Sequence, residues 1–155
     1  MYFPRQIQRD VDGKVRLHLQ PHEVALLREL LDELKTLLED PEDRALRRLF
    51  PPAHTDRENE EQYRSLVGDQ LLTGRMKALA TIRDTVGRDT LAPEEADAWL
   101  RALNDLRLVL GTRLDVKEDL DYEELDLTEP RGRDLAVYGY LSWLQEQLVE
   151  ALAVE

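Results

Sequence analysis

The first twenty residues alternate between apolar and polar side chains in the manner of a β-hairpin. From Lys14 to Leu19 the alternation is strict, which predicts a strand with one apolar face. A less regular strand precedes it, and Asp12-Gly13 lies between the two as the turn, because glycine accepts the positive φ that a tight hairpin needs. Two strands alone are marginally stable in water, so we expect residues 1–20 to pack on the rest of the chain.

From Pro21 onwards, apolar residues recur every three or four positions, which is the period of an amphipathic helix. The pattern predicts a leucine-rich helix from Pro21 to Asp40, a short helix over residues 42–50, a long helical stretch over 57–86, a helix over 93–114 and a last helix over 133–153. Gly68 and Gly74 weaken the middle of the long stretch, so we expect a bend or break there.

These elements predict a single, mainly α domain over residues 1–155. It is a bundle of four to five helices over residues 21–153, with a small N-terminal β-hairpin over residues 1–20. Between the last two helices, residues 115–132 form a polar loop that Pro130 and Gly132 close.

Acidic residues outnumber basic ones, and the excess is concentrated in that loop. The chain has 33 Asp and Glu against 21 Lys and Arg, a net charge of −12. Residues 115–129 hold eight acids and one lysine, which gives this stretch a net charge of −7. A strongly acidic chain repels phosphate backbones at long range, so nucleic acid is not the expected partner. The loop can instead steer a basic protein surface, through Asp119, Asp121, Glu123 and Glu124.

The sequence holds no recognisable pattern of catalytic, cofactor-binding or metal-binding residues. It has no cysteine, which excludes disulfides, thiolate metal sites and thiol catalysis. His18 and His22 lie on either side of Pro21, so one helical face cannot present both to a metal. The alternating acids from Asp119 onwards begin like a calcium loop, but the glycine and the bidentate glutamate of such a loop are missing from its sixth and twelfth positions.

The N-terminus gives no indication of export. Residues 1–10 carry Arg5 and Arg9 but no apolar core of a signal peptide. No apolar run approaches the ~18 residues of a membrane span. We therefore expect a cytoplasmic protein that does not cross a membrane.

The helix over residues 93–114 carries polar residues in or beside its apolar stripe. On a helical wheel Arg107 lies among the leucines of that stripe, with Asn104 at its edge. A guanidinium in this position must reach water or meet an acceptor. We expect Arg107 to be largely buried and bonded to a carboxylate or to helix-end carbonyls, so that it ties two helices together. Ligand binding is the alternative role.

Apolar residues also lie outside the inner stripe of the last helix, at Tyr138, Trp143 and Val149. Apolar residues on most sides of a helix are typical of a central helix, or of a helix that also meets another chain. We expect these three residues to contribute to an interface, and a homodimer is the simplest one.

The run from Trp99 to Gly111, WLRALNDLRLVLG, resembles the signature of an actinobacterial family of unknown-function proteins. That family takes its descriptive name from the actinomycete oxidative-stress regulator (AosR-like). Further similarity lies in the stretches 21–23, 46–51, 137–138 and 144–149. The resemblance implies a small cytoplasmic regulatory protein that acts through protein contacts, without an established active site. A thiol switch of the kind credited to family members cannot operate here, because the chain has no cysteine.

The function expected from the sequence is that of a non-enzymatic regulatory or adaptor protein, which acts through protein–protein contacts in stress-response transcription control. One alternative is a DNA-binding regulator that uses the hairpin as a wing and Arg44, Arg47 and Arg48 as phosphate contacts. Neighbouring acids such as Glu42 and Asp43 crowd these arginines. The other alternative is an enzyme with an unrecognised carboxylate site.

Overall fold

The structure is a computed structural model that describes residues 6–40, 57–116 and 121–153, with the backbone alone for residues 57–70. Its elements follow the order β1 (Ile7–Arg9), β2 (Val15–Leu17), α1 (Pro21–Leu38), α2 (Arg57–Thr85), β3 (Thr90–Leu91), α3 (Pro93–Leu114), the 3-10 helix η2 (Tyr122–Glu124) and α4 (Pro130–Ala153). The fold is mainly α with a small sheet near the N-terminus, which confirms the predicted class. The short helix expected over 42–50, with Arg44, Arg47 and Arg48, lies outside the described residues.

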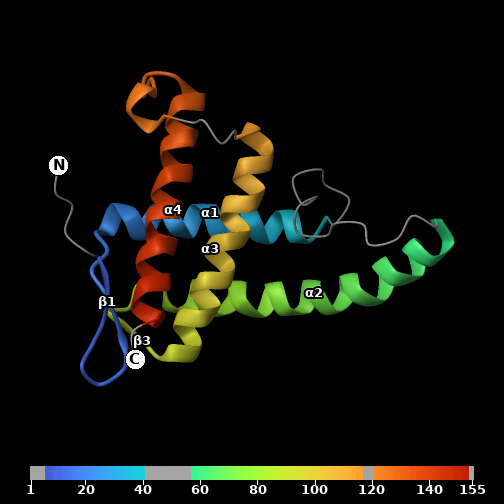
Figure 1. The fold of residues 1–155 in the computed structure, drawn as a ribbon, viewed down its shortest axis with the longest axis horizontal. Helices are drawn as coiled ribbons and strands as arrows, with labels where there is room; N and C mark the ends of the chain where they lie inside the picture. The colour runs from blue at the N-terminus through green and yellow to red at the C-terminus, as the bar shows by residue number, and fades with distance from the viewer. Residues whose placement is uncertain (1–5, 41–56, 117–120, 154–155) are drawn as a thin grey trace.

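The helices form two crossing pairs. α1 and α2 lie side by side, and α3 and α4 cross over them as a second pair (Figure 1). One continuous core lies between the pairs, because each helix turns its apolar stripe inward. Its largest fully buried side chains include Trp99, Leu27, Leu31, Ile82 and Leu103.

The predicted hairpin is present and is extended by a strand that the sequence did not reveal. β1 and β2 are antiparallel, with Ile7 opposite Leu17, and Gly13 between them has φ +86°, as the turn requires. β3 pairs with the other edge of β2, where Leu91 lies opposite Val15. A two-residue strand is too short to show a period of two, so the alternation pattern could not reveal β3.

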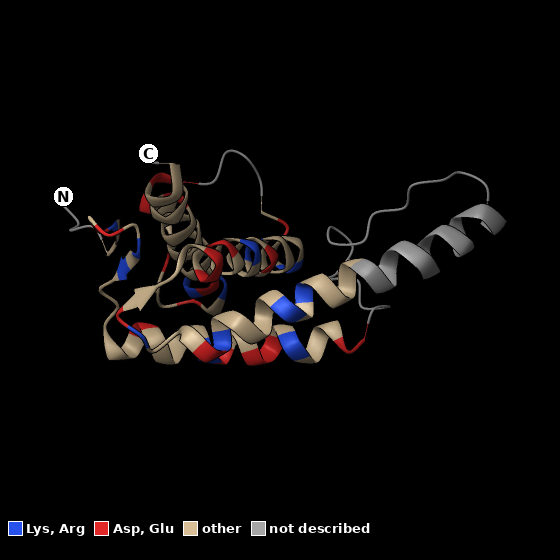
Figure 2. Ribbon diagram, turned by 90° about the horizontal axis from the view of Figure 1, so that it is seen from below, with Lys and Arg blue, Asp and Glu red and all other residues tan. Residues whose placement is uncertain are grey.

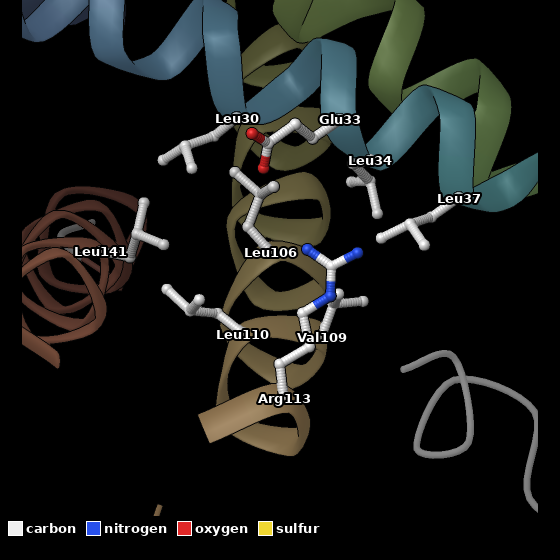
Figure 3. Close-up of a pocket in the computed structure, with 9 residues that line it drawn as sticks. All are labelled: Leu30, Glu33, Leu34, Leu37, Leu106, Val109, Leu110, Arg113 and Leu141. Carbon is white, nitrogen blue, oxygen red and sulfur yellow. The ribbon is translucent and has the colours of Figure 1, made fainter. Parts of the chain in front are cut away.

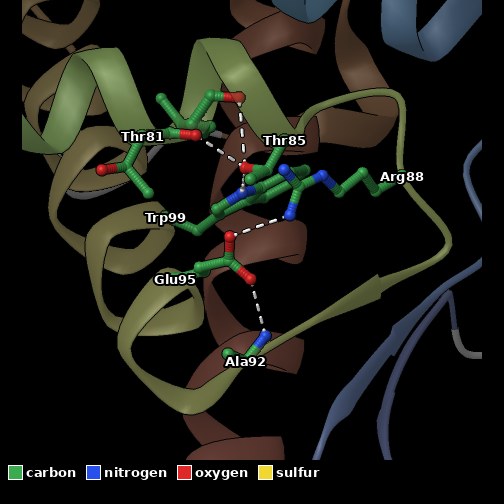
Figure 4. Close-up of polar contacts among 7 residues, drawn as sticks. Thr81, Thr85, Arg88, Ala92, Glu95 and Trp99 are labelled. Carbon is green, nitrogen blue, oxygen red and sulfur yellow. Dashed lines mark hydrogen bonds and ion pairs between the residues drawn. The ribbon is translucent and has the colours of Figure 1, made fainter.

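α1 and α3 begin in the same way, with a proline followed two residues later by a glutamate. In α1 the Glu23 carboxylate accepts a hydrogen bond from the backbone N–H of Gln20 (2.7 Å). In α3, which begins at Pro93, the Glu95 carboxylate accepts one from Ala92 (2.9 Å; Figure 4). Each glutamate satisfies a backbone donor at the helix start that has no partner within the helix. Both starts were predicted from the sequence.

Two helices differ in extent from what the sequence predicted. For the bend or break expected at Gly68 and Gly74, the structure excludes the break, because α2 runs without interruption through both glycines. Each glycine costs a helix about 1 kcal/mol, and the packing of the second half of α2 on α1 and α3 outweighs this. α4 begins at Pro130 and not at Arg133, because proline fits the first turn of a helix. A Cβ at Gly132 would lie 1.9 Å from the Asp126 carbonyl oxygen, so this start requires glycine there.

Trp99 is the largest side chain of the core and is fixed by a polar contact as well as by packing. Its indole N–H donates to the Thr85 hydroxyl (2.7 Å), which in turn donates to the Thr81 carbonyl (2.8 Å; Figure 4). One turn before Trp99, Glu95 also pairs with Arg88 (3.0 Å). The end of α2 is thereby tied to the first turns of α3.

Candidate interaction surface

Arg107 and Asn104 lie between α3 and α4, where both side chains meet Gln145. The Arg107 guanidinium donates to the Gln145 side-chain oxygen (2.5 Å) and lies 5.5 Å from the centroid of the Tyr138 ring. The Gln145 amide donates in turn to the Asn104 side-chain oxygen (3.4 Å). Arg107 therefore ties two helices together, but the expected acceptor is wrong. The guanidinium is half-buried and bonds an amide, because the nearby carboxylate of Asp105 belongs to the face of α3 that packs on α2.

Removing this arginine is expected to have a moderate effect on stability. Arg107→Ala should lower the free energy of unfolding by about 1–2 kcal/mol, since it removes one charged hydrogen bond and one cation–π contact at a half-exposed position. Arg107→Lys should not restore it, because an ammonium cannot keep the same planar contact with the Tyr138 ring. Urea unfolding measures the stability of both variants, and Arg101→Ala, at an exposed position of α3, is the control. A loss below half a kilocalorie would show that the side chain is simply solvated.

η2 brings an aromatic ring from the acidic loop onto α4. The loop segment with η2 folds back against the first half of α4 (orange in Figure 1). The Tyr122 ring lies so close to Gly139 that a Cβ there would be 2.7 Å from the nearest ring atom. Partial burial and the neighbouring Tyr138 raise the pKa of the Tyr122 phenol, against the opposing influence of Arg107 and Ser142. Gly139 thus provides the space in which Tyr122 sits on the helix.

The three residues predicted as an interface do not form one patch. Tyr138 is half-buried beneath the Arg107 guanidinium. Trp143 is 36% exposed and Val149 47% exposed, but six residues on a helix place them about 120° apart. Trp143 lies one turn after Gly139, on the face that Tyr122 covers, and Tyr122 is itself 46% exposed. Trp143 therefore lies one turn from the Gly139 position that Tyr122 covers, whereas Val149 lies on another face of α4.

Acidic side chains accompany these two rings. Glu123 and Glu124 follow Tyr122 directly, and Glu146 lies one turn after Trp143; all three are exposed. Asp121 has a local role, because its carboxylate accepts the Glu123 N–H (2.9 Å) at the start of η2. Asp119 lies outside the described residues. We call Tyr122, Glu123, Glu124, Trp143 and Glu146 the α4–η2 surface.

A buried ion pair between α2 and α3 was missed by the sequence interpretation. Arg75 donates to Asp105 (2.6 Å), and the two side chains are 23% and 3% exposed. Burial raises the pKa of the Asp105 carboxyl despite the charge and hydrogen bond of Arg75, which lower it. The sequence did carry a signal of this buried carboxylate, because Asp105 lies at helical spacing from the apolar residues Ala102 and Val109. All three residues are buried in the structure.

A second buried polar group joins α4 to the start of the chain. The side-chain oxygen of Gln147, which is 0% exposed, accepts the backbone N–H groups of Gln6 (2.7 Å) and Ile7 (3.2 Å). The side-chain amide of Gln6 donates a hydrogen bond to the Glu23 carboxylate (2.6 Å). Burial and the adjacent Glu23 carboxylate raise the pKa of the Tyr140 phenol far above its usual range. These contacts hold β1 between α1 and α4.

Two hollows in the described part of the chain differ in size and polarity. An apolar cavity of about 30 Å³ lies where α1, α3 and α4 meet, with Glu33 and Arg113 at its rim (Figure 3). It has room for one or two water molecules, whereas small-molecule sites measure roughly 300–1,000 Å³. A wider hollow of about 370 Å³ between α1 and α2 is polar and open, and Arg83 pairs with Asp32 there (2.8 Å).

The groups considered for metal or DNA binding are dispersed or paired. His18 and His22 are exposed, and the described residues contain no cluster of three metal-ligating side chains. In the hairpin, Arg16 pairs with Asp10 (2.9 Å), which lowers the pKa of that carboxyl. Basic and acidic residues are interspersed along α1 and the described part of α2 (Figure 2). The described faces of these helices are therefore not the continuous basic surface that duplex DNA favours.

Comparison with known proteins places this sequence among actinobacterial relatives. Residues 4–152 match the family described as Domain of unknown function (DUF2017). The chain is 31% identical to the putative oxidative stress regulator AosR of Mycobacterium leprae, in an alignment that covers 90% of this chain and 82% of the relative. It is also 31% identical to the oxidative stress regulator AosR of Mycobacterium tuberculosis, over 91% of this chain and 84% of the relative. No solved structure matches. Among the described residues, no helix combines the length and the apolar character needed to cross a bilayer.

Proposed function

Because this chain belongs to the DUF2017 family, in which mycobacterial relatives carry the name oxidative stress regulator, we propose that it is a regulatory protein of the cytoplasm. It acts without catalysis, by binding another protein in the control of a stress response. The observation that supports this proposal is the α4–η2 surface, where Tyr122 packs on Gly139, Trp143 lies one turn further along α4, and both side chains are exposed. Large aromatic side chains of this kind are enriched at the centres of protein interfaces.

The contact is proposed to use aromatic and acidic side chains rather than a redox-active thiol. The chain has no cysteine, so an oxidative signal cannot reach the partner through a disulfide or sulfenic acid of this protein. A protein that regulates its partner by reversible binding needs only a surface that the partner can bind and leave. Tyr122 is held on α4 by its contact with Gly139, and such preorganisation favours binding.

Replacement of Trp143 by a photo-crosslinking phenylalanine analogue in the native cell tests this proposal. We expect one protein to be captured in high yield from position 143. Position 11 is the matched control, because Val11 is fully exposed at the tip of the hairpin. With the captured protein purified, Trp143→Ala should weaken binding at least 10-fold, as expected for an aromatic hot spot worth about 2 kcal/mol.

Other outcomes of the same experiment separate the alternatives. Capture of a second copy of this chain would make the surface a homodimer interface, which stays a prediction until then. Equal capture from positions 11 and 143 would contradict a specific contact on α4. Salt-sensitive binding of duplex DNA by the purified protein, at sub-micromolar affinity and ~150 mM salt, would favour the DNA-binding alternative with the hairpin as a wing.

A further inference from the structure

We propose that the α4–η2 surface docks a basic segment of the partner protein, with a Lys or Arg side chain lying against the rings of Tyr122 and Trp143. Further basic side chains of that segment face Glu123, Glu124 and Glu146. This inference rests on the proposed function, because it assigns the chemistry of the partner to the same surface. It does not require the partner's identity.

The geometry brings two aromatic faces together at one place on α4. Tyr122 covers Gly139, and Trp143 follows four residues later, one turn along the same side of α4. Both retain more than a third of their exposure. The other tryptophan, Trp99, is fully buried and bonded to Thr85, so only Trp143 can meet a partner through its ring.

The surrounding charge determines which partner fits. From Asp121 to Glu146 the chain has seven acids and two arginines, a net charge of −5. The nearby Arg107 is already engaged by Gln145 and the Tyr138 ring. An exposed aromatic ring with carboxylates beside it attracts a cation twice, through the ring face and through the charge. An acidic or phosphorylated partner would be repelled from the same place.

Fluorine NMR of the full chain labelled with 5-fluorotryptophan tests this directly. Two resonances are expected, and Trp143→Phe identifies which of them belongs to Trp143. The probe is a short Lys- and Arg-rich peptide, compared with an acidic peptide of equal length. The basic peptide should shift the Trp143 resonance and leave that of Trp99 in place, whereas the acidic peptide should shift neither.

Two sets of charge variants separate this surface from the overall acidity of the chain. Glu123→Gln, Glu124→Gln and Glu146→Gln together should weaken peptide binding roughly 5- to 10-fold at low salt. The matched control is Glu29→Gln, Glu39→Gln and Asp84→Asn, which removes three exposed charges from α1, its end and α2. It should weaken binding less than about twofold, because those charges lie on neither α4 nor η2.

The inference is overturned if the Trp143 resonance does not shift at a saturating concentration of the basic peptide. It is equally overturned if both triple variants weaken peptide binding to the same extent. It is also overturned if a neutral apolar peptide shifts Trp143 as strongly and without dependence on salt. If the Trp143 resonance does not shift but one protein is specifically crosslinked to position 143 in the cell, the proposed function is retained and the partner segment is not basic. Peptide binding without any captured protein would contradict the proposed function while the basic-segment preference remained.

Discussion

Arg75→Ala should lower the free energy of unfolding by about 3–5 kcal/mol, one of the two largest effects expected for this protein. The substitution leaves the Asp105 carboxylate, 3% exposed, without the cation that neutralises it between α2 and α3. Arg83→Ala is the matched control on the same helix. Arg83 pairs with Asp32 where both are largely exposed, so its loss should cost between 0 and about 1 kcal/mol.

The effect of Arg75→Ala should depend on pH in a defined direction. Burial already raises the pKa of Asp105 in the folded protein, and removing Arg75 raises it further. A carboxyl with a raised folded-state pKa stabilises most below its unfolded value of about 4, and that contribution is lost as the pH rises through the folded value. The destabilisation should therefore be larger at pH 7 than near pH 4, as measured by urea unfolding at both.

A double substitution separates the charge from the packing at this position. Arg75→Met with Asp105→Leu removes both charges and keeps apolar side chains between the helices. It should recover most of the stability lost in Arg75→Ala, because buried ion pairs often exchange for apolar pairs at little cost. Equal instability of Arg75→Ala and the double variant would mean that the ion pair itself, through its hydrogen bonds, holds α2 on α3.

Gln147→Ala is expected to be comparably damaging, at about 3–5 kcal/mol. The backbone N–H groups of Gln6 and Ile7, at the start of β1, lose their acceptor, each at roughly 1–3 kcal/mol, and a cavity remains in the core. The hairpin should also lose protection from amide hydrogen exchange before the helices do. Gln8→Ala, at an exposed position of β1, is the control and should change stability by less than about 0.5 kcal/mol. Fast exchange throughout the core, and not in β1 alone, would contradict this localised effect.

The sequence predicted the parts of the fold that depend on local signals. Prolines marked the starts of α1 and α3, because a proline in the first turn loses no helical hydrogen bond. Leucine periodicity identified the inward faces, and Gly13 identified the hairpin turn. Pro130 was interpreted as the end of the acidic loop, although it is the first residue of α4. A proline can end one element or begin the next, so its identity alone does not decide between the two.

The sequence predicted some residues of the α4–η2 surface, but it did not predict that these residues belong to one surface. Trp143 and the loop acids were selected for separate reasons, one from a helical wheel and the others from charge. Tyr122 was not selected at all, because nothing in its local sequence shows that its ring reaches α4. Gly139 carried a usable signal, since a glycine inside a helix often marks a close approach of another group. The buried Gln147 was hidden for a related reason, because its partners, Gln6 and Ile7, belong to the opposite end of the chain.

The contact between Gln147 and β1 also has a consequence for synthesis on the ribosome. β1 emerges early and can pair with β2 at once, but its outer edge is completed only by a residue made 141 positions after Gln6. An open strand edge is a template for pairing with other chains, and here it stays open until the last helix has left the exit tunnel. The edge of β1 is therefore unprotected in the nascent chain until α4 has been made, and α4 completes the protection of that strand.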